Sequence, residues 1–285
     1  RASDVRTYEY VESLDEVAHL PEIILNKLKM EYRRYQVCGG MPEAVVAMLD
    51  NKGMAELEMV LQNILDMYEL DFAKYAAPRE IPRIRALWHS LPAQLSKENR
   101  KFIYNVIKSG ARSKDYEDAL LWLADAGMIH LVYNISKPGL PVSAYEQKEA
   151  FKVYASDCGL LRRLAHLPST VVMDPTSNYT EFKGAMAENA ALQALLPTME
   201  GQHLCYWTSE GKAEIEFIMQ KGERVIPVEV KAEDNISGRS LTVYNDRYKP
   251  DLRIRYSSLN LQYNSGLFSC PAPLAGWIDK FLQMV

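Results

Sequence analysis

The feature that most constrains the fold is a change from helical to strand periodicity after Pro197. Apolar residues recur at helical spacing over 183–196, and Pro197 ends that helix. The turn pairs Glu210-Gly211 and Lys221-Gly222 then separate strand-like runs, which is typical of two successive hairpins. We predict strands at 203–208, 213–220, 224–231 and 252–256, and helices at 240–248 and 274–285. This order predicts an α/β domain.

The first part of the chain is predicted to be helical. Apolar residues from Ile23 to Tyr35 lie at intervals of three and four, and Gly39-Gly40 ends that pattern. Pro42 then begins a second helix. A third apolar stripe follows, made of Leu57, Val60, Leu61, Ile64, Leu65 and Tyr68. These apolar stripes indicate helix faces that pack in the protein core.

Residues 79–154 have the element order of a winged helix. Three helices are expected, the first from about Ile84 to its end at Pro92, the others at 96–109 and 114–126. Two β-prone runs follow at 128–133 and 152–154 and predict a hairpin. Residues 168–182 are polar and contain prolines, so we interpret them as a linker.

Charge is distributed unevenly along a chain whose net charge is −4. Residues 79–115 hold nine basic and three acidic residues, net +6. Such a segment is a candidate phosphate-binding surface, and a solvated helical face is the alternative. The third helix is acidic, which argues against direct DNA reading by it. The candidate nucleic-acid-binding residues are Arg83, Arg85, Arg100, Lys101 and Arg112.

Composition narrows the class of protein. Hydrophobic residues make up 48% and charged residues 25% of the chain, which excludes a disordered or fibrous protein. No apolar run approaches the ~20 residues of a membrane helix, so we expect no membrane contact. Four separated cysteines without a CxxC pair argue against a structural zinc site and favour a cytoplasmic location. Because the first residue is Arg, we expect a piece of a longer protein.

Glu229 and Lys231 carry the strongest chemical signal. Residues two apart on a strand share a face, so these side chains point the same way, and Glu216 lies on the preceding predicted strand. With Glu188, on the helix before the sheet, they could converge at one sheet edge. Carboxylates there could hold Mg²⁺ for phosphodiester cleavage, assisted by Lys231. The alternative is a solvated strand edge with an ion pair.

The chain resembles the C-terminal portion of a large group of prokaryotic AAA-type ATPases. That portion carries a winged-helix segment and ends in a PD-(D/E)XK nuclease-like domain. The matching segments are Cys38–Glu43, Leu123–Ile129, Lys152–Leu160, Gly184–Asn189, Ala213–Ile218 and Ile226–Lys231.

The resemblance implies specific roles and partners. Glu188, Glu216, Glu229 and Lys231 would be catalytic, with Mg²⁺ held by the three glutamates; Glu216 stands where that group usually has Asp. The chain has no GxxxxGK[ST] motif, so we expect ATP to bind only in the full-length protein, on an N-terminal ATPase core that would be its partner. DNA is the other expected partner, and the sequence leaves the oligomeric state open.

The resulting expectation is a multi-domain α/β protein. Residues 1–78 would be a helical region after the ATPase core, 79–167 a winged-helix-like domain, and 168–285 a restriction-endonuclease-like α/β domain. Two functions remain open. The last domain either cleaves DNA with Mg²⁺ or is a non-catalytic nuclease-fold module that binds nucleic acid or protein and regulates the ATPase core.

Overall fold

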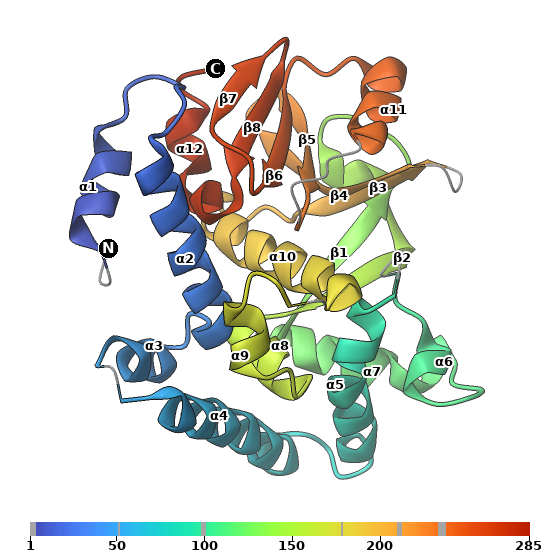
Figure 1. Cartoon of the computed structure of the whole chain (residues 1–285). Coiled ribbons are helices and arrows are strands. Elements are labelled where there is room, and N and C mark those ends of the chain that lie inside the picture. Colours follow the sequence, from blue (N-terminus) through green and yellow to red (C-terminus); the bar gives the residue numbers. More distant parts are fainter. Residues whose placement is uncertain (1–3, 51, 98–100, 178, 210–212, 233–237) are drawn as a thin grey trace. The chain divides into compact units, whose positions relative to one another are not determined.

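The structure, a computed structural model, describes residues 4–50, 52–97, 101–177, 179–209, 213–232 and 238–285. It has the α/β arrangement expected, with an N-terminal helical region and a C-terminal sheet domain (Figure 1). The helices of the first part are α1 (Val5–Ser13), α2 (Glu22–Cys38), α3 (Pro42–Leu49), α4 (Met54–Tyr75), α5 (Ile81–Leu95), α6 (Tyr104–Ile107) and α7 (Ser113–Asp125). None of the described helices combines the length and apolarity needed to cross a bilayer.

Strands and helices mix in the second part. The strands are β1 (Ile129–Ile135), β2 (Glu146–Ala155), β3 (Cys205–Ser209), β4 (Ala213–Lys221), β5 (Arg224–Val230), β6 (Arg253–Ser257), β7 (Gln262–Asn264) and β8 (Leu267–Pro271). They form one mixed sheet with strand order β2-β1-β3-β4-β5-β6-β8-β7. The helices are α8 (Cys158–Leu164), α9 (Ser169–Met173), α10 (Thr180–Leu195), α11 (Arg239–Tyr248) and α12 (Ile278–Phe281), with short 3₁₀ turns at Val142–Tyr145, Leu196–Thr198 and Ala272–Trp277.

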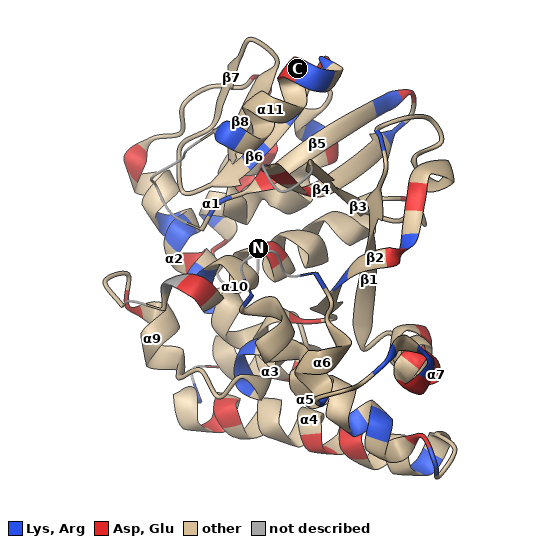
Figure 2. Ribbon diagram, turned by 90° about the vertical axis from the view of Figure 1, so that its right-hand side faces the viewer, with Lys and Arg blue, Asp and Glu red and all other residues tan. Residues whose placement is uncertain are grey.

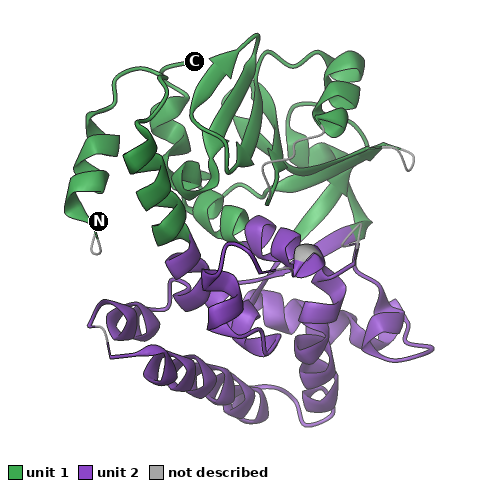
Figure 3. Cartoon of the chain, in the orientation of Figure 1, with its two compact units in different colours: residues 1–32, 132–150, 190–285 green, residues 33–131, 151–189 purple. Residues whose placement is uncertain are grey.

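The chain divides into two compact units (Figure 3). Unit 1 contains residues 1–32, 132–150 and 190–285, and unit 2 contains residues 33–131 and 151–189. The boundaries between them fall within α2, β1, β2 and α10.

Each unit has an aromatic centre. In unit 1, Trp207 on β3 meets Tyr244 on α11 edge to face, with ring centroids 5.1 Å apart. Both side chains are buried in a cluster with Ile215 and Ile218 of β4. In unit 2, Phe72 of α4 packs edge to face on Trp88 and Trp122, at 6.2 and 5.6 Å. These apolar centres fix the helices and strands around them because burial of large aromatic side chains is a major stabilising term.

Most of the predicted elements are confirmed, although some boundaries are wrong. Helix α5 does not end at Pro92 but runs on to Leu95. Pro92 removes only one N–H donor near the helix end, and burial of Gln94 and Leu95 favours the extra turn.

The helix predicted at 96–109 shrinks to α6. Residues 98–100 lie outside the described residues. The N–H of Phe102 donates to the Phe151 carbonyl at 2.9 Å, and the Gln94 amide makes hydrogen bonds of 2.9 and 3.0 Å with the Ile103 backbone. These contacts hold residues 102 and 103 in extended conformation.

The segments at 168–182 and 274–285 also differ from expectation. The predicted linker contains α9. The predicted final helix is a 3₁₀ turn followed by the four-residue α12, because Pro273 and Gly276 interrupt regular helical structure. Strands β7 and β8 were not predicted.

Candidate functional site

Strands β4, β5 and β6 lie side by side in the interior of the sheet. Each carries one charged residue of the candidate site: Glu216, Glu229 and Arg255. Strand β4 pairs antiparallel with β5, and Phe217 lies opposite Val228. If this pairing is continued by one residue, Glu216 on β4 comes opposite Glu229 on β5. Strand β5 pairs parallel with β6, with Glu229 opposite Arg255. The surrounding residues of β4 and β5 are apolar and buried. Charged groups in such strands require partners, because an isolated charge in an apolar environment is strongly unfavourable.

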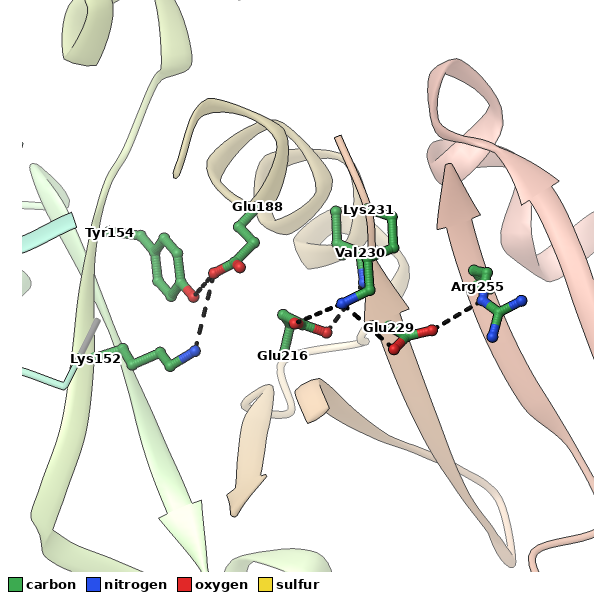
Figure 4. Close-up of polar contacts among 8 residues, drawn as sticks. All are labelled: Lys152, Tyr154, Glu188, Glu216, Glu229, Val230, Lys231 and Arg255. Carbon is green, nitrogen blue, oxygen red and sulfur yellow. Dashed lines mark hydrogen bonds and ion pairs between the residues drawn. The ribbon is translucent and has the colours of Figure 1, made fainter. Parts of the chain in front are cut away.

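Lys231 follows β5 and contacts both carboxylates (Figure 4). Its Nζ lies 3.9 Å from Glu216 Oε1 and 3.4 Å from Glu229 Oε1. Its backbone N–H donates to the Tyr256 carbonyl at 2.8 Å, which continues the pairing with β6 and fixes its position. The expectation that Glu229 and Lys231 share a face is therefore confirmed, and Glu216 joins them.

Glu216 and Glu229 are both buried, but they are held differently. Glu216 Oε2 accepts a 3.1 Å hydrogen bond from the Val230 N–H. Glu229 is 0% exposed, and its Oε2 accepts a 2.8 Å hydrogen bond from Arg255 Nε. Its other oxygen, Oε1, has no hydrogen-bond partner among the described residues and faces Lys231 only through the longer ion pair. A buried carboxylate oxygen of this kind retains capacity for another ligand.

Arg255 was not singled out from the sequence. The alternation Arg253-Ile254-Arg255 places both arginines on one face of a strand, but the pairing with Glu229 depends on contact between β5 and β6, which are 26 residues apart at this point. Arg255 is therefore an additional member of the cluster, which we call the β4–β6 charge cluster: Glu216, Glu229, Lys231 and Arg255.

Glu188 lies in unit 2, on α10, with its own set of partners (Figure 4). Its Oε2 accepts a 2.8 Å hydrogen bond from the Tyr154 hydroxyl and lies 3.9 Å from Lys152 Nζ. Lys152 is 0% exposed, so this is a buried ion pair on β2. The next residue, Asn189, makes hydrogen bonds with the N–H and carbonyl of Ala155, at 2.9 and 3.0 Å. The Glu188–Asn189 pair thus fastens α10 to β2.

No group of three or more His, Cys, Asp or Glu side chains suited to a metal ion occurs within the described part of the chain. Glu216 and Glu229 do approach one cation, Lys231, from two strands. Two carboxylates are enough for Mg²⁺, which commonly keeps several waters. The role of Glu188 as a third ligand stays a prediction.

Two of the predicted nucleic-acid-binding residues form ion pairs with acidic side chains. Arg83 Nη1 lies 2.9 Å from Glu80, and Arg85 Nε lies 3.7 Å from Glu69. Lys101 pairs through its backbone with Lys152 in an isolated bridge, and Arg112 is exposed before α7. Arg100 lies outside the described residues. Glu80 is already counted in the net +6 of residues 79–115, whereas Glu69 of α4 lies outside that segment and offsets part of its charge. Figure 2 shows acidic residues, in red, along α4 and α7.

Two of the segments that resemble the ATPase group, Cys38–Glu43 and Lys152–Leu160, contact each other inside unit 2. Asp157, 0% exposed, accepts hydrogen bonds from the N–H groups of Gly40 (2.6 Å) and Leu160 (2.9 Å). Arg162 is 1% exposed and donates to the carbonyls of Val37 and Leu167 and to the Glu58 carboxylate, at 3.0, 2.7 and 3.0 Å. These residues serve to join α2 and α8, so we assign the two segments to folding.

Two segments of the chain match known protein families. Residues 183–273 match the Domain of unknown function (DUF4143), which is found at the C-terminus of AAA-ATPase-type proteins. This agrees with the expected relationship to such ATPases. Neither the curated proteins nor the solved structures contain a match. Residues 29–171, just over half of the chain, match a second family, so the chain belongs to the family described as Domain of unknown function (DUF8612).

Proposed function

We propose that this chain is the C-terminal effector portion of an AAA-type ATPase, and that its sheet domain cleaves phosphodiester bonds in DNA with Mg²⁺. The observation that carries the proposal is the position of Lys231, 3.9 Å from Glu216 and 3.4 Å from Glu229. Two acids and a lysine at neighbouring strands suit metal-assisted phosphodiester hydrolysis, because the acids can hold the metal and the lysine can stabilise negative charge on the phosphate.

The residues present fit a magnesium ion. Glu229 Oε1 is buried without a hydrogen bond among the described residues, and it lies on the side of Glu229 that faces Lys231. Glu216 and Glu229 would hold the ion with oxygen ligands, which Mg²⁺ prefers. When bound, Mg²⁺ supplies Lewis acidity at the phosphate and a lower pKa for the attacking water.

Protein groups around the site would orient the two carboxylates and stabilise negative charge on the phosphate. The hydrogen bond from the Val230 N–H fixes the Glu216 carboxylate, and Arg255 fixes Glu229 through its second oxygen. Lys231 is 28% exposed, so its ammonium group can reach a phosphate oxygen from solvent. A cation placed there stabilises negative charge that develops on the phosphate.

The test is cleavage of labelled single- and double-stranded DNA with Mg²⁺ or Mn²⁺. We expect Lys231→Ala to lower the cleavage rate ~100-fold or more, as removal of a charge-stabilising group does. Lys249→Ala, an exposed lysine at the end of α11, is the control and should cleave as the wild type does. Wild-type protein without metal-dependent cleavage, or equal rates in Lys231→Ala and wild type, would sink the proposal.

The charge balance of the cluster favours a second candidate function. Lys231 and Arg255 offset the two carboxylates in number, so the attraction for a divalent cation is reduced. The nuclease-like domain would then be a non-catalytic module that binds nucleic acid or protein and regulates the ATPase core. This candidate predicts that the separately expressed ATPase core co-purifies with the chain and changes its ATP turnover, in the absence of any DNA cleavage.

A further inference from the structure

The β4–β6 charge cluster exposes its cations to solvent more than its carboxylates, since the Glu216 side chain is only 8% exposed. The side chains of Lys231 and Arg255 are 28% and 12% exposed, whereas that of Glu229 is 0% exposed. The two cations hold Glu229 from its two oxygens, with Lys231 at Oε1 and Arg255 at Oε2. A molecule that approaches this cluster therefore meets positive charge first.

Arg255 retains hydrogen-bonding capacity after its contact with Glu229. A guanidinium group has five N–H donors, and Nε supplies the one that Glu229 accepts. Its terminal nitrogens Nη1 and Nη2 donate to no acceptor among the described residues. These two nitrogens form a planar fork that matches the oxygens of a phosphate.

The start of α11 adds to the positive character around Arg255. A Cβ at Gly238, the residue before α11, would lie 2.6 Å from Arg255 Nη2, so the guanidinium group lies against the backbone there. Helix α11 has no side-chain cap at this end and no acidic residue in its first turn. A cation beside an uncapped helix N-terminus is electrostatically unfavourable unless an anion is present. Glu229 provides part of that compensation, and a phosphate would provide more.

We propose that Arg255 binds a backbone phosphate of the nucleic acid through Nη1 and Nη2, and that Lys231 is its neighbour in this contact. Arg255 thus has two tasks, since it fixes Glu229 from one side and holds the substrate from the other. This inference rests on the proposed function for the identity of the substrate, but phosphate binding requires neither metal nor cleavage.

The experiment is a fluorescence anisotropy titration of labelled DNA with the full chain, in EDTA. We expect Arg255→Gln to weaken binding about 10-fold and to lower the salt dependence by about one released counterion. Arg255→Lys keeps the charge but loses the fork, so it should weaken binding several-fold. Arg224→Gln is the matched control because Arg224 is exposed at the opposite end of β5, and it should change the affinity less than twofold.

The outcomes separate this inference from the proposed function. DNA binding that depends on Arg255, in a protein that does not cleave with Mg²⁺, supports the inference and contradicts the nuclease proposal. Cleavage by the wild type, with equal DNA affinity in wild type and both Arg255 variants, overturns the inference alone. If circular dichroism shows that Arg255→Gln is unfolded, Arg255→Lys decides, and wild-type affinity in that variant overturns the inference.

Discussion

The backbone N–H of Gly40 donates a 2.6 Å hydrogen bond to the carboxylate of Asp157, a residue 117 positions away that is completely buried. This contact joins the end of α2 to the start of α8 within unit 2. It depends on the glycine before it, because Gly39 has φ +69° and a Cβ there would lie 2.0 Å from Asp157 Oδ1.

Gly39→Ala is therefore expected to destabilise the protein strongly. Gly127 has the same φ of +69°, but nothing lies within 4 Å of a Cβ at that position, so Gly127→Ala is a matched control. The left-handed conformation costs both variants about 1–2 kcal/mol. Gly39→Ala should lose at least ~2 kcal/mol more in urea unfolding, because Asp157 must move and leave N–H groups unpaired. Equal losses would show that the close approach to Asp157 is absent.

Loss of the Glu229 carboxylate should expose repulsion within the β4–β6 charge cluster. Glu229→Leu leaves Arg255 and Lys231 without their shared partner, and we expect a loss of about 3 kcal/mol in the free energy of unfolding. The double variant Glu229→Leu/Arg255→Leu also removes the guanidinium group whose carboxylate partner is lost, and it should be more stable than Glu229→Leu alone. A double variant whose loss equals the sum of the two single losses would contradict a direct Glu229–Arg255 interaction.

The cysteines should be unreactive in the native protein. All four are buried as free thiols. Burial, reinforced by the negative charge of Asp157, raises the pKa of Cys38 to about 11, and burial with the Glu146 charge raises the pKa of Cys205 to about 12. Because the thiolate is the reactive form, a thiol reagent at mildly alkaline pH should modify them only as fast as the protein unfolds. Rapid modification in the absence of denaturant would contradict this burial.

His130 on β1 should make the protein less stable in mild acid. Burial lowers the pKa of His130 below its ordinary value of 6.5, since desolvation disfavours the charged ring. The unfolded chain therefore binds a proton at a higher pH than the folded one. Stability is expected to fall as the pH drops below 6.5 and through the folded pKa. His130→Phe should reduce this slope in urea unfolding measured at several pH values, and an unchanged slope would count against the prediction.

The elements that the sequence predicted best depend on local signals. A turn at Gly222 separates β4 from β5, and the apolar runs of β3, β4 and β5 are long enough to identify. The turn pair Glu210-Gly211, predicted between β3 and β4, lies outside the described residues. Strand β7 has three residues, all exposed, and so carries no apolar pattern. Pro92 illustrates the opposite error, because the burial of Gln94 and Leu95 overrides the local signal for a helix end.

The candidate site was predictable where the geometry is local. Glu229 and Lys231 share a face because strand geometry requires it, and the register of β4 on β5 follows from a short hairpin. Arg255 required the contact between β5 and β6, and the buried Lys152–Glu188 pair required the docking of α10 on β2. No periodicity in a single sequence reports such long-range pairings.

The central claim is that the Glu216 carboxylate takes part in metal-dependent cleavage, and its most direct test is the DNA cleavage rate of two variants as a function of Mg²⁺ concentration. Glu216→Asp keeps the carboxylate, whereas Glu216→Gln keeps the size but removes the charge. The account predicts cleavage within ~10-fold of wild type for Glu216→Asp and a loss of ~100-fold or more for Glu216→Gln, since a neutral amide oxygen attracts Mg²⁺ less strongly than a carboxylate does. Wild-type cleavage and wild-type Mg²⁺ dependence in Glu216→Gln would contradict it.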